Sequence, residues 1–358
     1  MNSAPTPNPA TVTLIQQPPR RGCVRYVILG ILLLVLLSAL GRLIVPATGL
    51  GMPLLGRSVA VVRIEGPINE STKVVRLIRD FRQNELVTAI VLRIDTPGGS
   101  VAASQEIYEE ALKARTIDKK PVVVSMGNAA ASGGYYIALA ADEVFANHGT
   151  ITGSIGVIGV NWNVEGILRR VQVDPVVLKS GEMKDTGSPL RRMSDADRHL
   201  LMGLIDDFYR QFVRAVLKAR ASRIETAMAS HPTRIDDILS TATTRATTET
   251  LVSGSFPVGD LARELGVAPA LEEAVRWMAD GRVYTGDQAL ALGLVDKIGT
   301  FTDAVERAGE LSGLGKRPKT VERRPDSSLP ALLGLGARQF REEFTRGGTT
   351  LEMRTGTY

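Results

Sequence analysis

The chain has 358 residues, of which 44% are hydrophobic, so it can bury a substantial core and does not have the composition of a disordered protein. Its net charge of +5 lies at its ends: residues 1–25 hold three arginines and no acid, residues 313–358 have a net charge of +4, and −2 remains for the residues between them. This distribution argues against a basic groove, and no nucleic-acid partner is expected. The single cysteine, Cys23, excludes an intramolecular disulfide framework, and without metal-ligand spacings or Gly-rich phosphate loops we expect no metal site and no cofactor.

The amino end of the chain predicts a membrane anchor. Residues 1–23, which are rich in Pro, Thr, Asn and Gln, predict a disordered cytoplasmic arm. A transmembrane helix is predicted at residues 24–46, because residues 26–41 are uncharged and mostly aliphatic. That uncharged run covers ~24 Å as a helix, and its flanks extend it to the ~30 Å of a hydrocarbon core if Arg42 reaches the headgroups.

The charges beside this segment predict its orientation. Arg20, Arg21 and Arg25 lie on its amino side, which predicts a cytoplasmic N-terminus and an extracytoplasmic domain. One alternative is a signal peptide cleaved near residues 45–47, but a proline just before the cut makes a poor substrate. The other alternative is a buried core helix, which does not explain the flanking charge. We therefore favour a retained anchor.

Residues 57–313 predict one α/β domain, in which short β-rich runs alternate with helical patterns. Strands are predicted at residues 59–64, 88–94, 122–126, 143–146 and 155–160, and helices at residues 71–84, 101–115 and 132–141. Single helices between strands are typical of βαβ units. The sheet is therefore expected to be mainly parallel and covered by helices.

A long amphipathic helix is predicted to follow Ser194, whose S-x-x-D pattern marks a helix start. Apolar residues recur at helical spacing over residues 200–217, and we expect this face in the core, with a subunit contact as the alternative for part of it. Residues 279–313 predict a turn, two helices and a short strand. Residues 314–358 carry no strong pattern and predict a flexible basic tail.

Ser132 is predicted at the N-terminus of a helix. The apolar run at residues 121–126 stops at small residues, and Ser132 then opens a Gly-Gly-Tyr-Tyr stretch that suits a packed helix. A hydroxyl there projects from a turn, and the unpaired backbone N–H groups of the first helical turn point toward negative charge that develops beside it. This is the layout of an acyl-transfer nucleophile.

A serine hydroxyl needs a neighbouring base to take its proton. A solvated role is expected for all three histidines, His148, His199 and His231. Lysine is the alternative base, because burial can lower its pKa from ~10.4 by several units. Lys179 and Lys184 both follow a predicted strand at residues 175–178, and the local sequence separates the two only weakly.

Several motifs resemble signal peptide peptidase A, a membrane-anchored bacterial protease of the ClpP/crotonase fold: SMGNAAASGGYY, TGSIGV, KSGEMKD, and ADGRVYTG with ALALGLVD. The resemblance covers most of residues 58–312. It implies an α/β fold of repeated ββα units with a mainly parallel sheet, preceded by one transmembrane helix. It also implies a hydrolase of the bacterial inner membrane: a Ser-Lys serine endopeptidase that degrades remnant signal peptides or other membrane-released peptides. A ring-like homo-oligomer and no cofactor are expected.

The same resemblance assigns roles to five residues. It implies Ser132 as the nucleophile and decides between the two lysines in favour of Lys184 as the general base. Ser154 of the TGSIGV motif is expected to hydrogen-bond the lysine amine and hold it toward the nucleophile. The backbone N–H groups of Gly99 and Gly133 are expected to form the oxyanion hole, because glycine lets the backbone approach the substrate carbonyl closely.

Residues 224–275 depart from the short form of the family and predict an insertion. Two other functions compete with the protease. One is a crotonase-like acyl-CoA enzyme that uses Gly99 and Gly133 as an oxyanion hole without a nucleophile. The membrane anchor and Lys184 argue against this enzyme. The other is a catalytically silent membrane scaffold.

Overall fold

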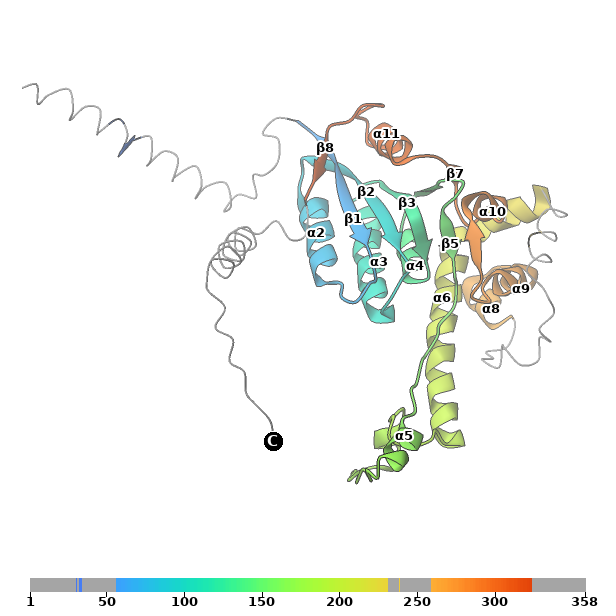
Figure 1. The fold of residues 1–358 in the computed structure, drawn as a ribbon. Coiled ribbons are helices and arrows are strands. Elements are labelled where there is room, and N and C mark those ends of the chain that lie inside the picture. Colours follow the sequence, from blue (N-terminus) through green and yellow to red (C-terminus); the bar gives the residue numbers. More distant parts are fainter. Residues whose placement is uncertain (1–29, 31, 34–55, 231–237, 239–258, 324–358) are drawn as a thin grey trace, which may run out of the picture. The chain divides into compact units, whose positions relative to one another are not determined.

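The computed structural model describes residues 56–230 and 259–323, together with the isolated positions 30, 32, 33 and 238 (Figure 1). The predicted cytoplasmic arm at residues 1–23 and nearly all of the predicted anchor at residues 24–46 lie outside the described residues. Within the described part of the chain, no helix is both long and apolar enough to cross a bilayer.

The described residues form an eight-stranded sheet in the order β6-β5-β3-β2-β1-β8, with β4 beside β3 and β7 beside β4. All of its strand pairs are parallel except β5 with β6. The strands are β1 (Ser58–Glu65), β2 (Val87–Thr96), β3 (Val122–Ala131), β4 (Glu143–Ala146), β5 (Ile151–Gly153), β6 (Val283–Thr285), β7 (Lys297–Ile298) and β8 (Thr320–Glu322). The predicted α/β class with a mainly parallel sheet is therefore confirmed.

Helices connect the central strands, as the alternating pattern predicts. Helix α2 (Thr72–Gln83) joins β1 to β2, α3 (Val101–Thr116) joins β2 to β3, and α4 (Gly133–Ala138) follows β3. Strands β1 to β3 are buried on both faces, which explains their continuous apolar runs. One face packs on α11 (Phe301–Leu311) through a core cluster that includes Val61, Val91 and Ala304.

Two predicted strands are wrong. The strand that pairs with the end of β3 is β5, and residues 155–160 form no strand. Residues 175–178 also form no strand, and they are exposed. Strand β5 pairs with residues 129–131, three alanines at the end of β3. Alanine has a weak strand propensity, so the sequence does not indicate this part of β3. The runs at residues 155–160 and 175–178 have strand-like composition but no pairing partner among the described residues.

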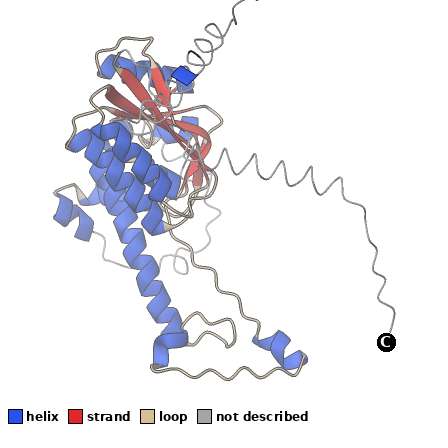
Figure 2. Ribbon diagram, turned by 90° about the vertical axis from the view of Figure 1, so that its left-hand side faces the viewer, coloured by secondary structure: helices blue, strands red, loops and turns tan. Residues whose placement is uncertain are grey.

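Residues 157–194, which we call the arm, leave the sheet after β5 and contain the short helix α5 (Glu165–Arg170) and the 3-10 helix η1 (Glu182–Asp185). Figures 1 and 2 show the arm running from the sheet to the N-terminal end of α6 (Asp195–Ser230). The arm exposes large apolar side chains, of which five are more than 70% exposed: Ile158, Val160, Trp162, Val176 and Leu178. Exposed large apolar side chains gathered in one segment are uncommon on monomeric soluble proteins.

The long helix α6 begins where the S-x-x-D pattern predicts. Its predicted apolar face divides in two: Phe212, Val216 and Leu217 are buried, whereas Leu200 is 44% and Leu204 47% exposed. The C-terminal half of this face therefore lies in the core. The N-terminal half is free for the predicted alternative, a subunit contact.

The described part of the predicted insertion at residues 224–275 includes two helices, α8 (Asp260–Leu265) and α9 (Pro269–Met278), which pack on α6. The tail predicted to be flexible from residue 314 is instead ordered at β8, which pairs with β1. Val321 is buried there, and Glu322 accepts a hydrogen bond from Arg63. Residues 324–358 lie outside the described residues.

Candidate active site

Ser132 occupies a sharp turn between β3 and α4. Its backbone has φ 53° and ψ −119°, a conformation that is rare for a residue with a side chain and that clusters at functional sites. Hydrogen bonds fix the turn on both sides: Ser132 N donates to Gly153 O at 2.8 Å, and Tyr136 N donates to Ser132 O at 2.9 Å. The helix that was predicted over residues 132–141 thus begins one residue later and ends earlier, with a half-buried Ser132 immediately before it.

The Pro-Gly-Gly turn after β2 lies against Ser132. Ile68 N donates to Gly98 O at 2.9 Å and Ser100 N donates to Ile68 O at 2.7 Å, so these bonds flank Gly99 without using its N–H. Neither Gly99 N–H nor Gly133 N–H donates a hydrogen bond to any other described residue. A Cβ placed on Gly133 would lie 3.4 Å from Gly99 N, so the two free donors are neighbours.

Close contacts require glycine at these positions. Gly98 has φ 101°, and a Cβ there would lie 2.8 Å from both Ser132 Cβ and Gly133 N. A Cβ on Gly99 would lie 2.2 Å from Ile68 O. The backbone can therefore pack directly against the serine only because side chains are absent.

Ser132, Gly99 and Gly133 line one cavity of about 30 Å³. Its other walls are mostly apolar or aromatic: Val101, Ser104, Gln105, Tyr136, Gly156, Val157, Phe208 and Phe212. The Tyr136 ring packs edge-to-face on Phe212 with 5.1 Å between ring centroids. Burial raises the pKa of the Tyr136 hydroxyl, so it stays neutral and adds no charge to this wall. The cavity suits a small apolar group beside the hydroxyl.

Ser154 follows β5, next to Ser132. Ala131 and Gly153 are direct partners in the β3–β5 register, so the two serines that follow them lie side by side. Ser154 also has a positive φ of 49°, and its N–H donates to Arg282 O at 2.8 Å. The structure thus brings together four of the five predicted site residues, with the position of Ser154 given by the strand register.

The remaining predicted site residue, Lys184, lies elsewhere on the chain. It is exposed in η1, and no hydrogen bond or ion pair links its side chain to another described residue. Its neighbour Thr186 donates to Asp197 near the start of α6, and Arg191 links Asp185 to the same Asp197. Phe208 of the Ser132 cavity is eleven residues further along that helix. Eleven residues of α-helix span ~16 Å, so one chain alone does not bring Lys184 to Ser132.

The rival Lys179 is already engaged. Its Nζ donates to Asp185 Oδ1 at 2.8 Å and to Glu182 O at 2.8 Å. Both contacts direct this amine toward the 3-10 helix η1 of its own chain. The two amines thus differ in the structure: Lys179 Nζ has two partners, whereas Lys184 Nζ has none among the described residues.

Two motifs near the C-terminal end of the domain, ADGRVYTG and ALALGLVD, pack against the elements that hold Ser132 and Ser154. The fully buried Tyr135 of α4 donates its hydroxyl to Leu294 O at 2.9 Å, a contact of ~1 kcal/mol that links α4 to the ALALGLVD segment. Tyr284 of the ADGRVYTG segment fills the space beside Gly153, where a Cβ would lie 2.7 Å from its ring. These contacts fix the turns at Ser132 and Ser154.

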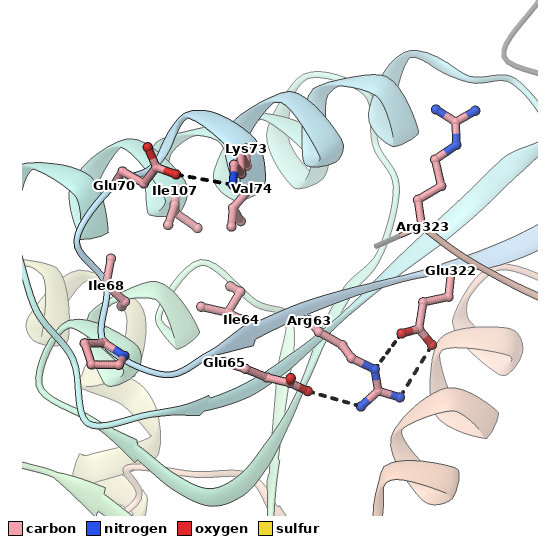
Figure 3. Close-up of a pocket in the computed structure, with 11 residues that line it drawn as sticks. Arg63, Ile64, Glu65, Ile68, Glu70, Lys73, Val74, Ile107, Glu322 and Arg323 are labelled. Carbon is pink, nitrogen blue, oxygen red and sulfur yellow. Dashed lines mark hydrogen bonds and ion pairs between the residues drawn. The ribbon is translucent and has the colours of Figure 1, made fainter. Parts of the chain in front are cut away.

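A second, larger cavity of about 910 Å³ lies at the end of β1 and is lined by Ile64 and Ile68 among others (Figure 3). Its charged side chains pair with one another: Arg63 with Glu65 and Glu322, and Lys73 with Glu70. It holds no serine or histidine and does not extend the chemistry of the Ser132 cavity.

The two described histidines lie on the surface. His148 is exposed and pairs with Asp287 at 2.8 Å, His199 is exposed on α6, and His231 lies outside the described residues. No cluster of three His, Cys, Asp or Glu side chains in the described ranges could hold a metal ion.

Comparisons with known proteins show that the amino-acid sequence is similar to those of peptidases. The profile of peptidase family S49 matches residues 114–230 and 269–315, and that of Clp protease matches residues 58–151. A putative protease of Synechocystis is 36% identical over 268 residues, which cover 74% of this chain and 78% of the relative. A putative signal peptide peptidase SppA of Enterococcus faecium is 30% identical over 64% of this chain and 52% of its own length, and Protease 4 of Salmonella typhi is 35% identical over 66% and 30%.

A comparison with solved structures finds similarity to a mutant 1510-N membrane-bound stomatin-specific protease in complex with a substrate peptide. It has a TM-score of 0.43 and 16% sequence identity, and the match covers 80% of this chain and 100% of that one.

Proposed function

Because this chain belongs to peptidase family S49, the family of signal peptide peptidase SppA, we propose that it is a serine endopeptidase with Ser132 as nucleophile and Lys184 as general base. The observation that carries this proposal is the turn at Ser132. There a strained serine shares one cavity with two backbone N–H groups that have no acceptor among the described residues. An acyl-transfer site needs this combination of a nucleophile and preorganised donors.

The chemistry follows from these groups. Ser132 Oγ attacks the carbonyl carbon of the scissile peptide bond while the Lys184 amine takes the hydroxyl proton. The N–H groups of Gly99 and Gly133 stabilise the oxyanion, and Ser154 orients the amine. The lysinium then gives its proton to the leaving amine, and water hydrolyses the acyl-enzyme by the same route. Each oxyanion donor contributes ~3 kcal/mol of transition-state stabilisation.

A neighbouring copy of the chain supplies Lys184 in this proposal. The distance between Lys184 and the Ser132 cavity within one chain supports this arrangement, as does the exposed apolar surface of the arm and of the first half of α6. A head-to-tail contact in which one protomer's arm covers the next protomer's site is heterologous, and such contacts close into rings.

The substrates we propose are remnant signal peptides and other peptides released from membranes. The small aromatic-walled cavity beside Ser132 favours a small apolar side chain before the cut. The predicted anchor at residues 24–46 holds the enzyme in the bacterial inner membrane with its N-terminus in the cytoplasm and residues 57–313 outside. There the site meets cleaved signal peptides as they leave the bilayer.

Covalent labelling of the full chain in detergent tests the nucleophile. We expect an alkyl fluorophosphonate to modify Ser132, located by peptide mapping, and to stop cleavage of a signal-like peptide followed by mass spectrometry. An unlabelled protein that instead turns over acyl-CoA would be a crotonase-like enzyme. A protein that does neither would be a scaffold, and either result contradicts the proposal.

Substitution of Gly98 tests the oxyanion hole. In Gly98→Ala the new Cβ pushes against Gly133 N, so we expect kcat to fall ~10²-fold, as when one oxyanion donor is removed. Gly66→Ala is the matched control, because Gly66 also has a positive φ, of 71°, but a Cβ there meets nothing within 4 Å. Equal losses of activity in the two variants would assign the effect to backbone strain and contradict the role of the turn.

A further inference from the structure

A cluster of four charged side chains fixes the arm to the start of α6. We call it the arm clamp, and it consists of Lys179, Asp185, Arg191 and Asp197. Arg191 Nε and Nη2 donate to the two carboxylate oxygens of Asp185 at 2.9 and 3.0 Å. Nη1 and Nη2 of the same guanidinium donate to Asp197, the second at 3.0 Å. One arginine thus bridges two carboxylates, and Lys179 completes the cluster by donating to Asp185.

The two carboxylates of the arm clamp are well buried, although most of the arm is exposed. The Asp197 side chain is 1% exposed and that of Asp185 is 11% exposed. Hydrogen bonds from Arg191 hold the pKa of both carboxyls well below the usual range, so both are charged at neutral pH. The cluster contains two positive and two negative charges. The two short helices of the arm have no buried residues, so ionic hydrogen bonds and not apolar packing hold this segment.

The arm clamp does more than begin a helix. Asp197 and Ser194 exchange the reciprocal bonds of a capping box, with Ser194 N donating at 2.9 Å and Asp197 N donating to Ser194 Oγ at 3.1 Å. Capping needs nothing further, yet Asp197 also accepts bonds from Arg191 and from Thr186 Oγ1, the latter at 2.8 Å. These additional bonds lead to the two residues that follow Lys184.

The residues on both sides of Lys184 are therefore held by hydrogen bonds, whereas its own amine makes none to the described residues. Lys179 Nζ donates to Glu182 O on one side, and Asp185 and Thr186 are bound on the other. The Lys184 side chain is exposed and has no partner among the described residues. A rigid backbone under a free functional group is the arrangement by which a supporting shell positions a reactive side chain.

We propose that the arm clamp is the positioning device for the general base: it holds η1 so that Lys184 enters the neighbouring protomer's Ser132 cavity in one fixed geometry. The proposal rests on the function proposed above, in which Lys184 is the base. Arg191 is its central positioning residue, because it alone joins the carboxylate beside Lys184 to the helix. A lysine would not replace it, since an ammonium cannot bridge two carboxylates in the planar fork geometry.

The test compares full-length variants in detergent by kcat, KM and oligomer mass. In Arg191→Ala we expect kcat to fall ~10²-fold through misplacement of the base, with KM within about twofold of the wild-type value and an unchanged mass. Arg191→Lys should recover little. Thr186→Val removes one bond of the arm clamp at nearly constant shape, and we expect a several-fold fall in kcat. Arg169→Ala is the matched control, because Arg169 forms an exposed ion pair with Glu165 on the same arm, and its kcat should not change.

Three results would overturn the proposal. The first is a wild-type kcat in Arg191→Ala. The second is loss of activity only together with loss of the oligomer, which would make the arm clamp a structural element. The third is a rise in KM at constant kcat, which would place it in substrate binding. Lys184→Ala separates this failure from that of the proposed function, because a fully active Lys184→Ala would show that the base itself is wrong.

Discussion

The full-length Ser132→Ala protein is expected to cleave peptides at least ~10⁴-fold more slowly than the wild type, with its oligomer intact. Removal of a serine nucleophile leaves only the contribution of the oxyanion donors and of substrate binding. The substitution keeps the Cβ and so makes no new contact in the turn between β3 and α4. The turn is held by backbone bonds to Gly153 and Tyr136, which alanine retains.

The measurement is the initial rate of cleavage of a signal-like peptide, with KM determined beside it. Ser312→Ala is the control, because Ser312 lies at the end of α11 and its hydroxyl donates only to helix carbonyls. Ser154→Ala should fall between the two, since Ser154 orients the base and does not attack. Retention of one tenth of the wild-type rate in Ser132→Ala would exclude Ser132 as the nucleophile.

Pattern and composition predicted the central sheet because its strands carry their own signal. Strands β1 to β3 are buried on both faces, so their apolar runs are long enough to recognise. Short elements that exist only through pairing were missed. The alanines at residues 129–131 and the three residues of β8 become strands because β5 and β1 lie beside them. Such pairing depends on contacts far apart in the chain, which local propensity does not encode.

The candidate site likewise contains residues that the local sequence indicates and residues whose role depends on distant contacts. Ser132, Gly99 and Gly133 each sit in a turn whose small residues are visible in the sequence, and the structure places them in one cavity. The difference between Lys179 and Lys184 is not visible in the sequence, because it consists in the hydrogen bonds that each amine makes in the folded chain. Asp185 binds Lys179 across six residues, and only the folded arm shows this. The sequence predicts Phe208 only as part of the apolar face of a helix and does not indicate that it lines the cavity.

Lys184→Ala is expected to lower kcat about 10³-fold, the contribution typical of a positioned general base. Lys184→Arg is the informative partner variant, because it keeps the positive charge but a guanidinium stays protonated at every working pH. We therefore expect Lys184→Arg to be as inactive as Lys184→Ala. A Lys184→Arg enzyme with more than one tenth of the wild-type rate would show that the residue acts through its charge and not as a base.

Mixed oligomers of two inactive chains distinguish a dyad shared between protomers from one within a chain. If Ser132 of one protomer uses Lys184 of the next, some sites in a mixture of Ser132→Ala and Lys184→Ala chains receive both intact residues. Random assembly at equal amounts through a heterologous contact should restore about one quarter of the wild-type rate. The two full-length chains would be co-expressed with different tags, and hetero-oligomers isolated by sequential affinity steps. A dyad within one chain leaves every mixed site broken, so mixed oligomers as inactive as their parents would disprove the shared site.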